Sequence, residues 1–250
     1  MEEEVIRSLV GVCHRLHARG WVANHDGNVS ARLEGKAAYV ASPTAVSKAA
    51  VGPEMVVRLD ADGKVSSGTR KVFSEISLHL ACFAARPDIR WVVHAHPPTA
   101  TGFAVAGMCP FDPPFLAEAV VSLGARIPLV PFTAPGANQA ALTEAIAGCD
   151  AVLLENHGVL VVGPDAETAF LRMELVEHLA RIALVARQLG GPRPLPESVL
   201  VELLAARQRA GLGPGSTSVP SAGAASPGQA TPSASADADS VVREALRRFS

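Results

Sequence analysis

Two histidines stand one residue apart at the end of an apolar run, in the stretch WVVHAHPP (91–98). Side chains on an extended segment repeat with period two, so His94 and His96 point to the same side and present two imidazoles to one place. Taken alone, the pair is equally well explained as two surface histidines at a strand end. Two imidazoles do not complete a metal site, so a metal centre would need a third ligand.

A third imidazole follows another apolar run, in LLENHGVLVVG (153–163). His157 stands beside Gly158, which lets the backbone come close. A catalytic zinc commonly has three protein ligands and an open position for water or substrate. Three neutral imidazoles leave the charge of the ion uncompensated, which makes it a strong Lewis acid toward a carbonyl or hydroxyl oxygen. His94, His96 and His157 are therefore candidate ligands of one divalent metal.

Such an ion needs a base nearby, and Glu75 is the candidate. It lies at the start of the helix that SEISLHLACFAARPD (74–88) predicts, with Ser74 placed to cap the helix and Pro87 to end it. A glutamate in a first helical turn more often serves the helix dipole. His79 lies one turn further along, where it either orients Glu75 or is simply structural.

Strands and helices alternate along the chain, which predicts a sheet covered by helices. The hydrophobic periodicity and turn residues predict helices over 2–20, 74–88, 98–107, 138–150 and 165–189. Strands are expected over 25–33, 37–44, 89–96, 127–132 and 151–163, the last interrupted at His157-Gly158, with a hairpin over 55–68 around Asp62-Gly63.

Composition and charge exclude several classes of protein. The chain has 250 residues, 48% of them hydrophobic, which is enough for a sizeable core. A net charge of -2 without a Lys/Arg run argues against nucleic acid or an anionic membrane as partner. The acidic N-terminus and the lack of an apolar run of about 18 residues predict a cytoplasmic protein. The four cysteines are far apart and form no thiolate zinc site.

The last forty residues differ in composition from the rest. Residues 211–240 are almost entirely Gly, Pro, Ala, Ser and Thr, which predicts a disordered linker after a domain spanning 1–210. The final stretch, 241–250, is a short basic amphipathic segment that either docks on a surface or only keeps the chain in solution.

Four stretches occur in the order and spacing of the class II aldolase/adducin family: GWVANHDGNVSARL, ASPTAVS, SEISLHLACFAARPDIRWVVHAHPPTATGFAV and LLENHGVLVVGPDAETAFLRMELVEHLARIAL. Over residues 5–190 the chain resembles this family, and most of all its L-fuculose-phosphate aldolase branch, because Glu75 stands where epimerases of this fold usually have aspartate. The resemblance implies an α/β protein, a three-layer α/β/α sandwich with a central mixed sheet. It also implies a homotetramer with each site at a subunit interface.

The resemblance further implies the chemistry. His94, His96 and His157 would bind a divalent metal, usually zinc, and Glu75 would sit at the open position and shuttle a proton. The metal would hold the carbonyl and adjacent hydroxyl of a keto sugar. The expected function is thus a zinc-dependent aldolase that cleaves or forms a carbon–carbon bond of a small ketose, expected to be a phosphate, through a metal-bound enediolate.

Phosphate recognition in the family uses backbone N–H groups of tight turns and a helix start. The corresponding residues here are Gly27, Asn28, Ser42, Thr44 and Ser74. Two positions depart from the family pattern: Ala45 replaces a glycine, and Phe73 replaces the first of two serines. Phe73 removes a hydroxyl donor and adds bulk, which leaves a smaller or unphosphorylated substrate open.

The proton donor is less defined. Sugar-phosphate aldolases of this type use a tyrosine from a neighbouring subunit, whereas the single tyrosine here, Tyr39, lies in an N-terminal strand. The corresponding region, FDPPFLAEAVVSLG (111–124), offers Glu118, either as the acid or as an ordinary solvated charge. A decarboxylase, dehydratase or epimerase with the same metal site is the alternative. An adducin-like binding module is disfavoured because adducin heads lack the histidines, and no nucleophile motif supports a metal-dependent hydrolase.

Overall fold

The computed structural model describes residues 2–132 and 139–214. Over these residues the chain forms an eight-stranded sheet in the order β4-β3-β2-β1-β5-β8-β7-β6. The β6–β7 pair is parallel and the other neighbours are antiparallel. The predicted mixed sheet is therefore confirmed. The strands are β1 (Asn28–Arg32), β2 (Tyr39–Ala41), β3 (Val57–Leu59), β4 (Val65–Ser67), β5 (Trp91–Ala95), β6 (Leu129–Val130), β7 (Ala151–Leu154) and β8 (Gly158–Gly163).

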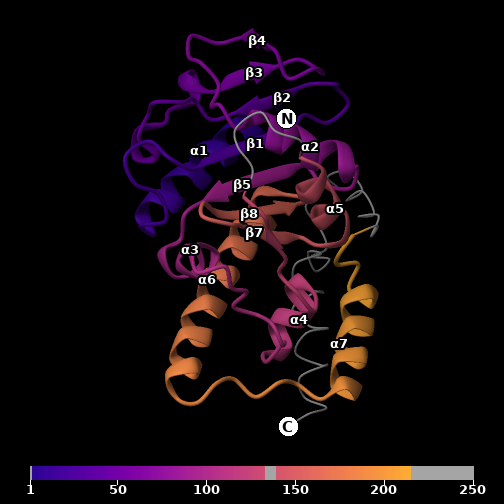
Figure 1. Ribbon diagram of the computed structural model, residues 1–250. Helices are drawn as coiled ribbons and strands as arrows, with labels where there is room; N and C mark the ends of the chain where they lie inside the picture. The colour runs from indigo at the N-terminus through magenta and orange to yellow at the C-terminus, as the bar shows by residue number, and fades with distance from the viewer. Residues whose placement is uncertain (1, 133–138, 215–250) are drawn as a thin grey trace, which may run out of the picture.

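Helices cover both faces of this sheet (Figure 1), which gives the predicted three-layer sandwich. The α-helices are α1 (Glu2–Ala18), α2 (Ile76–Ala85), α3 (Pro98–Val105), α4 (Ala117–Leu123), α5 (Ala140–Gly148), α6 (Ala166–Gln188) and α7 (Glu197–Arg209). Two short 3-10 turns, η1 (Lys48–Ala50) and η2 (Pro53–Met55), connect β2 to β3.

Alternation along the central strands sorts their side chains into two cores. Val93 of β5 and Val161 of β8 face the core built with α1, α3, α4 and α6, whereas Val92 and Val162 face the core built with α2 and α5. All four side chains are fully buried. Burial of each contributes about 1.5–3 kcal/mol, so the two cores fix the register of β5 against β8.

Most predicted elements are confirmed, with two corrections. The predicted strand over 151–163 is a hairpin, because β7 and β8 pair antiparallel around the turn at 155–157. The prediction that Ser74 caps the helix is wrong: α2 begins at Ile76, and Glu75 occupies the cap position without a side-chain cap hydrogen bond. Ser74 is exposed in the preceding turn, where the amide of Ile76 donates to the carbonyl of Phe73 at 3.4 Å.

Helices α4 and α7 were not among the predicted elements. Helix α4 has seven residues, too few for a clear periodicity, and α7 packs against it at the edge of the first core. The predicted linker and basic segment, 211–240 and 241–250, fall outside the described residues except for 211–214. Within the described part of the chain, no helix is long and apolar enough to cross a membrane.

Candidate metal centre

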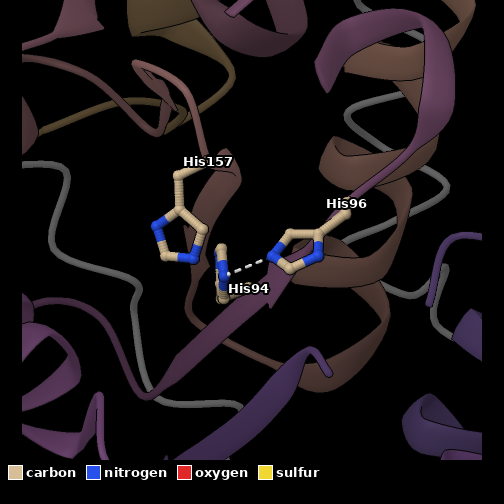
Figure 2. Close-up of side chains that lie close together, drawn as sticks. All are labelled: His94, His96 and His157. Atoms are coloured by element: carbon tan, nitrogen blue, oxygen red, sulfur yellow. Dashed lines mark hydrogen bonds between the residues drawn. The ribbon is translucent and has the colours of Figure 1, made fainter. Parts of the chain in front are cut away.

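The three histidines meet at one end of the central strands (Figure 2). His94 lies in β5, His96 follows the end of that strand, and His157 lies in the turn before β8. One ring nitrogen of each lies within 4.8 Å of the others. We call these residues the histidine cluster. The antiparallel pairing of β5 with β8 brings them together, since it sets Ala95 opposite Val159.

A glycine is required where the two strand ends meet. A Cβ atom on Gly158 would lie 2.5 Å from Cδ2 of His96 and 2.7 Å from the carbonyl oxygen of Ala95, closer than real Cβ contacts allow. Gly158 therefore permits the approach of the His157 turn to His96.

Hydrogen bonds fix the orientation of two of the rings. Nδ1 of His94 donates to the carbonyl of Val159 at 2.9 Å, and Nδ1 of His96 donates to Oδ2 of Asp26 at 2.9 Å. Both Nε2 atoms then carry lone pairs, and they face each other at 3.1 Å. Two acceptors at this distance need a cation between them, and imidazole nitrogens suit zinc and similar divalent ions. The residues therefore fit a metal ion.

Burial keeps the innermost ring in the form that binds metal. His94 is almost fully buried, and this burial lowers its pKa to about 3, so the imidazole is neutral near pH 7. Metal ligands must be deprotonated, and a neutral histidine meets that requirement without a compensating cost.

The carboxylate of Glu75 faces the histidine cluster. Its Oε1 lies 2.9 Å from Nε2 of His157, and its Oε2 lies 3.7 Å from Nε2 of His94. Oε2 also accepts a hydrogen bond from Nδ2 of Asn28 at 2.7 Å. Burial favours the neutral acid, but the hydrogen bonds from His157 and Asn28 and the neighbouring imidazoles outweigh burial and hold the pKa of Glu75 below its ordinary value. The ionised form of Glu75 is therefore available as a base.

A buried chain of hydrogen bonds holds Glu75 in place. Asn28 donates to Glu75, so its Oδ1 is free to accept from Nε2 of His79 at 2.6 Å, and Nδ1 of His79 accepts from the hydroxyl of Ser30 at 2.7 Å. Burial lowers the pKa of His79 to about 3, and the ring stays neutral. His79 thus supports Glu75 through Asn28 rather than by direct contact.

Two of these supporting residues, Asp26 and Ser30, were not found by sequence reasoning. A signal existed for Ser30, since period-two alternation on β1 puts Asn28 and Ser30 on the same side. Asp26 stands next to Gly27 in the loop before β1 and meets His96 only because β1 pairs with β5. Nothing in the local sequence predicts that contact.

The residues predicted for phosphate binding differ in their burial and in their hydrogen-bond partners. Gly27 has φ +68°, and a Cβ there would lie 2.4 Å from Cγ1 of Val22, so this turn needs glycine. Both ends of the Asn28 amide are engaged by Glu75 and His79. Ser42 is buried, and its hydroxyl accepts from the amide of Val29 at 3.1 Å.

Thr44 and Ser74 lie in turns outside the cluster. The amide of Thr44 donates to the carbonyl of Lys71 at 2.9 Å, and Ser74 is exposed. Within the described residues, neither forms a hydrogen bond with the histidines or Glu75.

The two departures from the family pattern have different structural settings. Ala45 has φ +56°, so it adopts the left-handed conformation that glycine adopts without strain. Phe73 is buried, and its ring packs against His79 with centroids 4.9 Å apart. The bulk of Phe73 therefore fills core space beneath His79.

The predicted proton donor lies apart from the cluster. Glu118 is half-buried in the first turn of α4, and in the described part of the chain it makes no hydrogen bond or ion pair. Tyr39 stacks on Phe83, with ring centroids 5.0 Å apart. No contact in the described residues joins either side chain to the three histidines.

Comparison with known proteins identifies relatives of this architecture. The sequence profile of the family described as "Class II Aldolase and Adducin N-terminal domain" matches residues 7–184, more than half of the chain. A 5-deoxy-D-ribulose 1-phosphate aldolase of Bacillus thuringiensis is 30% identical over 197 residues, which cover 78% of this chain and 91% of the relative. A 3-oxo-tetronate 4-phosphate decarboxylase of Escherichia coli is 29% identical over 201 residues, 78% of this chain and 91% of the relative.

A solved structure of an L-fuculose 1-phosphate aldolase superimposes with a TM-score of 0.73 at 25% identity, over 81% of this chain and 95% of that one. This match confirms the predicted resemblance to the fuculose-phosphate aldolase branch. The chain therefore belongs to the class II aldolase/adducin family, whose aldolases are metal-dependent, and it is a lyase.

Proposed function

We propose that the protein is a zinc-dependent aldolase that cleaves or forms a carbon–carbon bond of a small ketose, with a ketose phosphate as the favoured substrate. The single observation that carries this proposal is the histidine cluster, with two Nε2 atoms 3.1 Å apart and the Glu75 carboxylate 2.9 Å from the third ring. Relatives that are sugar-phosphate aldolases support the same reaction class.

His94, His96 and His157 would hold the ion through their Nε2 atoms. When bound, zinc supplies Lewis-acid polarisation of a carbonyl oxygen and stabilises the negative charge that develops as the bond breaks. In the direction of bond formation, the Glu75 carboxylate removes a proton from the carbon next to the substrate carbonyl. In the cleavage direction, the protonated Glu75 gives that proton back to the carbon from which the aldehyde has left.

The remaining groups complete the proposal. Gly27, Asn28, Ser42, Thr44 and Ser74 line the turns that we assign to the substrate phosphate. We assign the acid to Glu118 of a neighbouring subunit in a homotetramer. It would protonate the aldehyde oxygen as the bond forms and take that proton back in the cleavage direction. Exposed apolar residues at the C-terminal end of α6 support such an interface: Leu184, Val185 and the following Leu189 are 46%, 55% and 82% exposed. Light scattering that gives a monomer would contradict this assembly.

A decarboxylase with the same metal site is the second candidate. The similarity to the Escherichia coli 3-oxo-tetronate 4-phosphate decarboxylase, over 78% of this chain, favours it. Both reactions leave electrons on a carbon next to a carbonyl, so the same cluster serves either one. The products separate them, since only the decarboxylase releases carbon dioxide from a keto acid phosphate.

The test is aldol synthesis by the zinc-loaded protein from dihydroxyacetone phosphate, or free dihydroxyacetone, with glycolaldehyde or lactaldehyde. We expect Glu75→Gln to lower the rate about 10²- to 10⁴-fold, the usual contribution of a general base, with zinc content unchanged. Glu118→Gln is the matched variant, and it should slow the reaction if Glu118 is the acid. A Glu75→Gln protein with the wild-type rate would contradict the proposed base, and carbon dioxide release without aldol synthesis would favour the decarboxylase.

A further inference from the structure

Lys48, at the start of η1, is a buried lysine that the proposed reaction does not use. Its side chain is 1% exposed, although lysine is almost never fully buried without a partner. The ammonium donates to the carbonyl of His25 at 3.1 Å and to the carbonyl of Val46 at 3.4 Å. Among the described residues it forms no ion pair, and its hydrogen-bond acceptors are these two backbone carbonyls.

These two carbonyls belong to different loops, of which the first contacts the histidine cluster through Asp26. His25 lies in the loop 23–27, which is exposed at its tip and contains two residues with positive φ, Asn24 and Gly27. Val46 follows Ala45, which also has positive φ. Lys48 therefore ties together two loops that each contain a non-glycine residue in the left-handed conformation, Asn24 in the first and Ala45 in the second.

The loop 23–27 carries the carboxylate that orients His96. Asp26 accepts from the amide of Ala23 at 2.6 Å through Oδ1 and from Nδ1 of His96 at 2.9 Å through Oδ2. The position of Asp26 thus depends on the residue just before it, whose carbonyl Lys48 holds.

The electrostatic setting agrees with this role. Burial lowers the pKa of Lys48, and the negative charge of Asp26 opposes that effect. The nearby Cys13 thiol is buried, which raises its pKa to about 12, so it carries no charge near pH 7. Asp26 is then the anion that Lys48 balances.

We propose that Lys48 is a positioning residue of the metal centre: through the carbonyl of His25 and the charge of Asp26, it holds Asp26 against His96 and so sets the affinity of the cluster for zinc. This inference rests on the proposed function, because it requires the cluster to bind zinc. Loss of a residue that orients a metal ligand typically costs 10- to 100-fold in metal affinity.

The test is the zinc dissociation constant of the purified full-length protein, measured by competition with a chromophoric chelator. We compare wild type, Lys48→Met, Asp26→Asn and the double variant. Lys48→Met keeps the length of the side chain and removes its charge and donors. We expect it to raise the dissociation constant about 10- to 100-fold, and to change it less than about 3-fold in the Asp26→Asn background, because Lys48 acts through Asp26.

The matched control is Arg172→Met, which removes another buried cation. Arg172 lies in α6 and donates to the carbonyl of Val162, near the end of β8 that lies away from the cluster. Arg172→Met should lower the free energy of unfolding and leave the zinc dissociation constant unchanged. The visible spectrum of the cobalt-substituted protein gives a second readout, which should change in Lys48→Met and not in Arg172→Met. A merely structural lysine would move neither the dissociation constant nor the spectrum.

Wild-type zinc affinity in Lys48→Met would overturn the inference. So would a rise in the zinc dissociation constant that Lys48→Met causes equally in the wild-type and the Asp26→Asn backgrounds. If Lys48→Met does not fold, Lys48→Gln replaces it; if neither folds even with zinc, the lysine serves the fold and the inference is wrong. A folded wild type that binds no zinc would instead refute the proposed function.

Discussion

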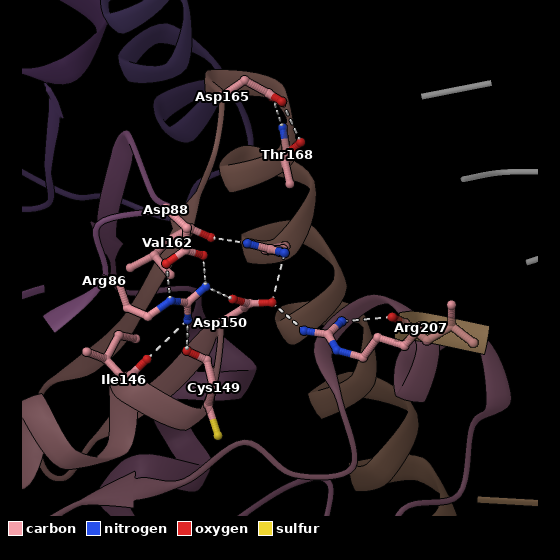
Figure 3. Close-up of polar contacts among 11 residues, drawn as sticks. Arg86, Asp88, Ile146, Cys149, Asp150, Val162, Asp165, Thr168 and Arg207 are labelled. Carbon is pink, nitrogen blue, oxygen red and sulfur yellow. Dashed lines mark hydrogen bonds and ion pairs between the residues drawn. The ribbon is translucent and has the colours of Figure 1, made fainter. Parts of the chain in front are cut away.

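Two polar clusters lie at opposite ends of the paired strands β5 and β8: one contacts Val159 near the start of β8, and the other contacts Val162 near its end. Their side chains are paired in different ways (Figures 2 and 3). The histidine cluster lies where β5 ends and β8 begins. At the other end, the fully buried carboxylate of Asp150 lies between arginine side chains. This second group, which we call the arginine cluster, consists of Arg86, Asp88, Asp150, Arg172 and Arg207.

Every charge in the arginine cluster has a partner of opposite sign. Asp150 pairs with Arg86 at 3.0 Å, with Arg172 at 2.8 Å and with Arg207. Asp88 pairs with Arg86 through both carboxylate oxygens, at 2.7 and 2.6 Å. These contacts join the residue just before β7 to the residue that follows α2, to α6 and to α7.

The histidine cluster lacks this matching. Two of its nitrogens are acceptors that face each other at 3.1 Å, and its third ring is 32% exposed. A polar cluster with complementary partners thus holds elements together, whereas a cluster that gathers acceptors alone is suited to bind a cation.

The largest effect on stability should come from Asp150. Asp150→Asn leaves three buried arginines without their shared charge, and we expect it to lower the free energy of unfolding by about 3–5 kcal/mol. Urea unfolding of the metal-free protein measures this loss. His157→Ala, at the other end, should change that free energy by less than about 1 kcal/mol, because its contact with Glu75 is partly exposed. A larger loss of unfolding free energy in His157→Ala than in Asp150→Asn would contradict this difference between the two clusters.

A smaller effect should appear in the pH dependence of stability. His79 has its pKa lowered to about 3 in the folded protein, whereas an unfolded histidine titrates near 6.5. Between these values the unfolded chain binds a proton that folded His79 does not, so stability falls as the pH falls. His79→Gln cannot take up this proton, and its stability should fall less steeply, by up to about 1.4 kcal/mol per pH unit. Identical slopes for the two proteins, measured by urea unfolding, would show that His79 is not neutral in the fold.

The smallest effect should come from an exposed pair of the same chemistry as the arginine cluster. Arg15 and Glu167 form a salt bridge with side chains 41% and 59% exposed. Solvent screens such pairs, so Glu167→Gln should lower the free energy of unfolding by less than about 1 kcal/mol. A loss as large as that of Asp150→Asn would show that burial does not separate the two kinds of ion pair.

Local sequence patterns predicted the elements that carry the histidine cluster. The apolar run ending in His94 and His96 and the glycine beside His157 both reflect short-range geometry, the two-residue repeat of a strand and the freedom of a glycine turn. The α/β/α architecture followed from the alternation of strands and helices and from the family resemblance, and it is confirmed.

The supporting residues could not be predicted in the same way. Asp26 meets His96 across 70 positions, and Arg207 meets Asp150 across 57 positions. Such contacts depend on strand order and helix packing, which periodicity does not encode. A charged residue in a loop or at a helix end has the same local signature whether it is solvated or buried in a cluster, and the same holds for Lys48.

The most direct test of the account is the metal content of the purified protein. Elemental analysis should find about one zinc ion per chain in wild type and none in His94→Ala or His157→Ala, whereas folded Asp150→Asn should keep its zinc. A folded wild type without metal, or a His94→Ala variant that retains it, would contradict the claim that the three histidines form a metal site.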